Sequence, residues 1–163
     1  MGWMMETERC HALPPLPGTY ALVLRISRRL EILVGRLGTL PVEPGFYVYV
    51  GSAFGPGGLA RRVGRHAMAE KKRRWHIDYL TDLAALDEVW YTTDAAHREC
   101  QWANVFRQIP GATVPLERFG SSDCRCCSRL FSFQKRPSLR TFRQRLMGSI
   151  HGHGPTYSAR PDG

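Results

Sequence analysis

The sequence predicts an α+β domain in which a small antiparallel β-sheet is flanked by helices. Runs rich in β-branched and aromatic residues lie in the first third of the chain, and segments with helical spacing follow them. The chain has 163 residues, of which 43% are hydrophobic. This length favours one domain and is enough to bury a core without disulfides or a structural metal. The composition excludes wholesale disorder, and no apolar run is long enough to predict a membrane-spanning helix.

The N-terminal part of the chain contains the clearest strands. Residues 1–17 are expected to form a flexible leader, because prolines end it and it lacks the basic start and apolar middle of a signal peptide. Residues 20–26 (YALVLRI) and 30–34 have the composition of strands. Glycines and prolines in residues 35–45 predict a loop. The run FYVYV, residues 46–50, predicts a third strand before a glycine-rich turn.

Helices dominate the remainder. Leu59, Arg62, Val63 and His66 recur at the spacing of one helix face. The elements expected after this helix are, in order, a helix over 75–85, a strand over 86–92, a helix over 95–108, a strand over 130–133 and a basic helix over 138–147. Residues 148–163 hold several glycines without apolar periodicity and are expected to be a disordered tail. The domain is therefore expected to span residues 18–147.

The charge distribution points to a polyanionic partner. The chain holds 23 Lys and Arg against 14 Asp and Glu, a net charge of +9. Residues 61–74 contain seven basic side chains and one acidic one, and residues 118–145 contain eight and one. Two concentrated basic blocks favour nucleic acid as the partner over a protein that is merely basic, and no membrane partner is expected.

Cysteine usage suggests a reducing compartment. The five cysteines are an odd number in a chain with no predicted export signal, so we expect a cytoplasmic protein without a disulfide framework. One alternative is a structural zinc site, formed by the candidate ligands His97, Cys100, Cys124 and Cys126. The spacing of the second pair is CxC rather than CxxC, which favours small buried thiols instead.

Several short motifs recur in a fixed order along the chain. Gly18-Thr19-Tyr20 opens the first strand, Tyr49-Val50-Gly51 ends the third, and LARRVGRH follows at residues 59–66. This order resembles the GIY-YIG nuclease family. The segments WHIDYL (75–80), REC (98–100) and FGSSDCRC (119–126) look like the Uri-type branch, whose members are small stand-alone domains. The resemblance covers roughly residues 18–133 and implies a GIY-YIG-like fold.

The resemblance also implies an activity, the metal-dependent hydrolysis of phosphodiester bonds in DNA. It assigns Tyr20 and Tyr49 to the activation and orientation of water, and it assigns Arg62 to the scissile phosphate. His66 matches a histidine of some members, and His76 is a further catalytic candidate. Residues alone leave open which tyrosine is the base, because a phenol has a pKa near 10 unless cations lower it.

Glu99 is the expected metal ligand. Its spacing to Trp102 and Phe106 places it on an otherwise apolar helix stripe, where a carboxylate needs a partner or a metal. The alternative is a salt-bridged glutamate at the edge of that stripe. The resemblance implies the family's metal-binding glutamate here, and a hard ion held by one carboxylate and waters suits Mg²⁺ or Mn²⁺.

Three further alternatives follow from the sequence. No asparagine follows Asn104, so the role of the family's terminal asparagine falls to Ser121, Ser122 or Asp123. Trp75 could stack on bases of a single strand, although its more ordinary role is packing. Finally, the chain could be a non-catalytic nucleic-acid-binding module that retains the GIY-YIG fold.

Overall fold

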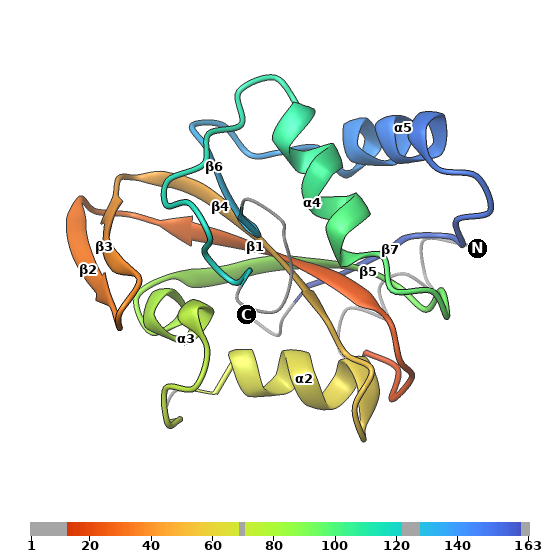
Figure 1. Cartoon of the computed structure of the whole chain (residues 1–163), viewed down its shortest axis with the longest axis horizontal. Helices are drawn as coiled ribbons and strands as arrows, with labels where there is room; N and C mark the ends of the chain where they lie inside the picture. Colours follow the sequence, from red (N-terminus) through yellow and green to blue (C-terminus); the bar gives the residue numbers. More distant parts are fainter. Residues whose placement is uncertain (1–12, 69–70, 122–127, 161–163) are drawn as a thin grey trace.

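The α+β architecture is confirmed. A computed structural model describes residues 13–68, 71–121 and 128–160 (Figure 1). Within this part of the chain, a five-stranded antiparallel sheet has the order β6-β4-β1-β5-β7, and β2 and β3 form a separate two-stranded sheet. The strands are β1 (Thr19–Ile26), β2 (Leu30–Val34), β3 (Gly38–Val42), β4 (Gly45–Ser52), β5 (Ala85–Thr92), β6 (Leu130–Phe133) and β7 (Tyr157–Ala159). The helices are α2 (Gly58–His66), α3 (His76–Thr81), α4 (Glu99–Gln108) and α5 (Leu139–Ser149).

Helices cover both faces of the large sheet. Tyr20, Leu22 and Leu24 of β1 belong to the apolar cluster that contains α2 and α3, and the alternate residues Ala21 and Val23 belong to the cluster that contains α4 and α5. Figure 1 shows these two helix pairs on opposite sides of the sheet. Burial on both faces explains why β1 is a continuous apolar run rather than an alternating one.

The expected loop over residues 35–45 is wrong, because it contains strand β3. Leu40 and Val42 are fully buried, whereas the alternate residues Thr39 and Pro41 are exposed. This alternation with a period of two is the mark of a strand. Pro41 lies in a two-stranded sheet, where a missing N–H is tolerated on the outer side. Because glycine and proline are typical of loops, the alternation of buried and exposed residues could not be recognised from the sequence.

The expected disordered tail is also wrong for its described part. Helix α5 continues to Ser149, and β7 pairs with β5 as the edge strand of the large sheet. The Gly154 N–H donates to Asp94 at 2.7 Å, and the Ser158 hydroxyl donates to Glu88. The segment is therefore held by specific tertiary hydrogen bonds, which leave no periodic pattern in a sequence.

Two other boundaries differ from the expectation. Helix α3 ends at Thr81 rather than near residue 85, and α4 begins at Glu99 rather than at residue 95. Residues 1–12 of the expected leader lie outside the described residues. The carbonyl groups of Pro14 and Leu16 accept hydrogen bonds from the first turn of α2, at 3.1 and 2.8 Å. Among the helices described, none is both long and apolar enough to cross a bilayer.

Candidate reaction cavity

Five of the predicted site residues line one small cavity. The cavity has a volume of about 180 Å³ and lies where β1 begins and β4 ends. Its described lining residues are Tyr20, Tyr49, Gly51, Ser52, Arg62, His66, Arg74, Trp75, His76, Gly120 and Arg129. The chain thus brings together both predicted tyrosines, the arginine and both histidines from four separate segments.

The register between β1 and β4 places the two tyrosines side by side. Tyr20 pairs with Gly51 and Leu22 pairs with Tyr49, so both phenols lie on the same sheet face as diagonal neighbours. Tyr20 is 1% exposed and Tyr49 is 8% exposed. A Cβ atom on Gly51 would lie 2.5 Å from the hydroxyl oxygen of Tyr20. The glycine of the YVG motif is therefore required by the close approach of the Tyr20 ring.

Helix α2 supplies Arg62 and His66 from one face. These residues are four apart, so their side chains share the face that packs on the sheet. The Tyr20 hydroxyl lies 2.7 Å from His66 Nε2, within hydrogen-bond distance. The His66 side chain is buried, and its Nδ1 has no hydrogen-bond partner among the described residues. A buried, half-satisfied imidazole beside a phenol is an unusual arrangement for a purely structural core.

Burial sets the protonation states in the cavity. Desolvation raises the pKa of Tyr20 well above its ordinary value, an effect that the neighbouring Tyr49 adds to and that Arg62 opposes. Desolvation likewise raises the pKa of Tyr49 to about 12, although Arg129 and Arg62 lower it. The pKa of His66 falls to about 3, mainly through burial. Near neutral pH both phenols are therefore protonated and His66 is neutral.

His76 is held by the loop that precedes β6. Its Nδ1 accepts a hydrogen bond from the Gly120 N–H at 3.0 Å, so the proton of the neutral ring resides on Nε2. Its ring centre lies 5.6 Å from that of Phe119. Partial burial lowers the pKa of His76, which keeps the ring neutral. His76 therefore offers the cavity a hydrogen-bond donor rather than a second proton acceptor.

A buried ion pair, absent from the sequence-based prediction, positions the arginines. Arg65 forms a two-point pair with Asp78, at 2.8 and 3.0 Å, and Asp78 also accepts from the N–H groups of Arg74 and Trp75. Burial raises the pKa of Asp78, but these hydrogen bonds outweigh it and leave the carboxyl below its usual value. The guanidinium groups of Arg62 and Arg65 lie 4.6 and 4.1 Å from the Trp75 ring centre. The only feature of the sequence that points to this ion pair is the position of Asp78 as the third residue of a helix.

Arg129 is a second cavity residue that sequence reasoning missed. It precedes β6, and its charge lowers the pKa of Tyr49. Of the three candidates for the asparagine role, Ser121 is 1% exposed and its hydroxyl has no partner among the described residues. Ser122 and Asp123 lie outside the described residues. No local sequence pattern distinguishes Arg129 from the other basic residues around it.

Glu99, the predicted metal ligand, is not among the described residues that line the cavity. It is the first residue of α4, on the other face of the sheet. The N–H of Arg98 donates to the Thr19 hydroxyl at 3.3 Å, so α4 begins beside the residue that precedes Tyr20. The Glu99 side chain is 15% exposed, and its Oε2 is buried without a hydrogen-bond partner in the described structure. Such an oxygen fits a hard divalent cation, for which carboxylates are preferred ligands.

The alternative zinc ligands are only partly described. His97 is exposed and stacks on Phe54 with a ring separation of 3.9 Å. Cys100 is exposed, so the expectation of a buried thiol is wrong for this cysteine. Cys124 and Cys126 lie outside the described residues. Within the described ranges, no three His, Cys, Asp or Glu side chains are grouped as a metal site would require.

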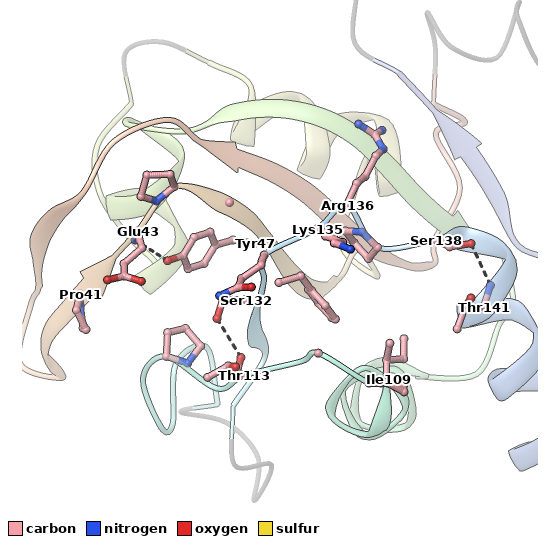
Figure 2. Close-up of a pocket in the computed structure, with 18 residues that line it drawn as sticks. Pro41, Glu43, Tyr47, Ile109, Thr113, Ser132, Lys135, Arg136, Ser138 and Thr141 are labelled. Carbon is pink, nitrogen blue, oxygen red and sulfur yellow. Dashed lines mark hydrogen bonds between the residues drawn. The ribbon is translucent and has the colours of Figure 1, made fainter.

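A larger hollow lies at the β6 edge of the sheet (Figure 2), but several of its polar groups are already engaged. Glu43 N–H donates to the Tyr47 hydroxyl at 3.0 Å, and Ser132 is hydrogen-bonded to Thr113. The Arg136 guanidinium pairs with Asp87 and Glu88. The smaller cavity, with its half-satisfied histidine, is therefore the better candidate for chemistry.

Comparison with known proteins identifies a family. The model of a family described as "Domain of unknown function DUF123" matches residues 19–151. The match begins at the first residue of β1 and covers every described helix, and β7 lies beyond its end. No curated protein and no solved structure matches the chain.

Proposed function

We propose that this chain, a member of the DUF123 family, is an endonuclease that hydrolyses phosphodiester bonds in DNA with the help of Mg²⁺ or Mn²⁺. The observation that carries the proposal is the 2.7 Å contact between Tyr20 and His66, in a cavity that also holds Tyr49 and Arg62. The order of the motifs, which resembles that of GIY-YIG nucleases, supports the same chemistry. We place the activity in the cytoplasm, where the cysteines stay reduced.

The first requirement of hydrolysis is a group that binds the scissile phosphate. Arg62 borders the cavity, and its guanidinium group rests against the Trp75 ring, which fixes its orientation. A planar fork of N–H donors can bind two phosphate oxygens at once and stabilise charge that develops on them. The His76 Nε2–H and the Arg129 side chain border the same cavity and add hydrogen-bond donors.

The second requirement is a proton acceptor for the attacking water. Neither tyrosine can serve alone, because burial holds both pKa values above 10. In our proposal Tyr20 accepts the proton from water while its own hydroxyl proton passes to Nε2 of the neutral His66. The phosphate that enters the cavity carries negative charge and raises the pKa of His66, which strengthens it as a base. Tyr49 orients the water from the neighbouring strand.

The third requirement is stabilisation of the departing oxygen. Glu99 would hold the divalent ion through its unpartnered carboxylate oxygen, together with water ligands. When bound, such an ion acts as a Lewis acid that stabilises the leaving alkoxide. Glu99 lies near the start of β1, on the side of the sheet that carries α4. The proposal therefore requires the bound DNA backbone to pass around this end of the sheet, from the cavity to Glu99.

A nicking assay tests the proposal. Supercoiled plasmid DNA is incubated with the protein in Mg²⁺, in Mn²⁺ and in EDTA, beside the variants Arg62→Ala and Glu99→Gln. We expect cleavage only with metal, and a loss of at least about 100-fold in each variant. Arg28→Ala, which removes an exposed charge just beyond the end of β1 opposite to Tyr20, is the matched control and should cleave normally. Full activity in Glu99→Gln would contradict its role as the metal ligand.

A non-catalytic DNA-binding module is the second candidate, because Glu99 is absent from the described cavity lining. It predicts salt-sensitive binding without cleavage in any metal. A panel of single-stranded, duplex, branched and flapped DNA, and of RNA, distinguishes the two candidates and defines the preferred substrate.

A further inference from the structure

A basic groove adjoins the reaction cavity. It has a volume of about 760 Å³ and shares Arg62, Arg74 and Trp75 with the cavity. Its described lining residues are Ala53, Gly55, Pro56, Gly58, Ala60, Arg61, Arg62, Gly64, Arg65, Met68, Lys71, Lys72, Arg74 and Trp75. These residues include six cations and no acidic side chain. The groove follows α2 and the segment between α2 and α3, so it extends the positive surface outward from the cavity.

Ion pairing divides five of these six cations into two groups, and the sixth, Arg62, borders the reaction cavity. Arg65 is paired with Asp78, and Lys71 is paired with Asp82. Arg61, Lys72 and Arg74, in contrast, form no salt bridge with any described acidic residue, and all three are exposed. The paired cations hold α2 against α3. The Arg74 guanidinium lies 6.0 Å from the Trp75 ring centre, and the charges of all three residues are exposed to a ligand.

The groove lacks an open aromatic surface. Proteins that bind single strands stack successive bases on aromatic side chains. Trp75 is the only aromatic residue among the described lining, and two guanidinium groups already contact its ring at 4.1 and 4.6 Å. The alternative of base stacking on Trp75 therefore lacks support. What the groove offers is positive charge without a base-reading surface, which suits a phosphate backbone.

We propose that this groove binds the backbone of duplex DNA beside the scissile phosphate, through Arg61, Lys72 and Arg74 and without regard to sequence. The inference rests on the proposed function, because it takes the cavity as the site of cleavage. A duplex is favoured over a single strand because it presents two closely spaced phosphate backbones to a charge-only surface. Arg62 then joins the two sites, since it borders both the groove and the cavity.

Equilibrium binding in EDTA tests the proposal without requiring cleavage. Fluorescence anisotropy with a labelled 30-base-pair duplex (about three helical turns) and with the matching single strand compares the wild type, the double variant Arg61→Gln/Lys72→Gln and the control Arg140→Gln/Arg145→Gln. The control removes two exposed charges from α5, on the other face of the sheet. Far-UV circular dichroism verifies that each protein is folded.

We expect the wild type to bind the duplex more tightly than the single strand. The groove variant should lose about 10-fold in affinity for the duplex, and the slope of log K against log salt should fall by nearly two, at about 0.9 per phosphate contact. The control should bind like the wild type. Equal losses in the two double variants, or tighter binding of the single strand, would overturn the proposal. Normal groove-dependent binding without nicking would instead contradict only the nuclease function.

Discussion

His66 carries a hydrogen bond to Tyr20 on one ring nitrogen and has a second, buried nitrogen without a partner in the described structure. A charged imidazole at this position would be poorly solvated, and the nearby cations Arg65, Arg62 and Lys71 oppose the favourable effect of Asp78. The folded state therefore strongly prefers the neutral ring. This preference links the stability of the whole domain to pH.

The pH dependence has a definite sign. In the unfolded chain His66 binds a proton below pH 6.5, whereas in the folded chain its pKa is about 3. Stability is therefore fully present above pH 6.5 and is lost as the pH falls toward 3. Between pH 7 and pH 5 we expect this residue to cost roughly 2 kcal/mol. Urea denaturation of the wild type and of His66→Gln at both values measures it. Parallel pH profiles in the two proteins would contradict the prediction.

The Tyr20 hydroxyl should matter for cleavage more than for folding. Tyr20→Phe keeps the buried ring and removes one hydrogen bond, which costs about 1 kcal/mol of stability. Loss of the proton path to His66 should reduce cleavage by about 100-fold or more. Tyr47→Phe is the matched control, because it removes the hydroxyl that accepts from Glu43 on another part of β4. Equal cleavage rates in the two variants would show that Tyr20 takes no part in the chemistry.

The sequence alone predicted those cavity residues that belong to short motifs in a fixed order along the chain. Tyr20, Tyr49, Arg62, His66 and His76 all line one cavity, as their order in the chain had suggested. Arg129 and Asp78 escaped notice because their roles depend on tertiary contacts with distant segments. That these residues catalyse a reaction stays a prediction.

At the scale of elements, the β1–β4 pair determines whether Tyr20 can reach His66. Gly51→Ala would place a methyl group 2.5 Å from the Tyr20 hydroxyl oxygen and ring, both of which are buried. We expect a loss of about 1–3 kcal/mol in stability from overpacking, together with loss of cleavage. Gly148→Ala, within α5, meets nothing within 4 Å and should stabilise the protein by up to about 1 kcal/mol. Thermal unfolding and the nicking assay report both quantities.

Strands and helices differed in how readily the sequence revealed them. β1, β4 and β5 were predicted nearly to their ends, because β-branched, aromatic and other apolar residues dominate these strands. β3 was missed because Gly38 and Pro41 are typical of loops, and only the pairing with β2 makes this segment a strand. The start of α4 was placed four residues too early because Ala95 extends the apolar spacing of the helix without belonging to it.

At the scale of the whole molecule, β7 completes the large sheet although it lies beyond the residues that match the family. The segment that contains it donates hydrogen bonds to Asp94 and Glu88, and its His153 accepts one from the Trp102 indole. Each of these partners is buried or half-buried. The sequence could not reveal this, because glycine-rich segments that pack by hydrogen bonding resemble disordered ones in composition.

Truncation tests the role of the residues after His151, which include β7. A chain that ends at His151 leaves the Glu88 carboxylate without Ser158 and exposes the outer edge of β5. We expect a loss of at least about 2 kcal/mol in the free energy of unfolding, since several buried polar groups lose partners. Guanidinium denaturation measures it, with Ser158→Ala as the milder comparison. An unchanged midpoint in the truncated chain would mean that β7 contributes nothing to the fold.

The residues just before β1 close off one end of helix α2. The carbonyl oxygens of Pro14 and Leu16 accept hydrogen bonds from the N–H groups of Ala60 and Leu59. In many phosphate-binding proteins the N–H groups at the start of a helix instead donate to the bound anion. A DNA strand bound as proposed would therefore meet guanidinium and ammonium groups instead of free helix amides. Recognition of this kind would depend on individual side chains rather than on the backbone, so single substitutions are expected to change binding without altering the fold.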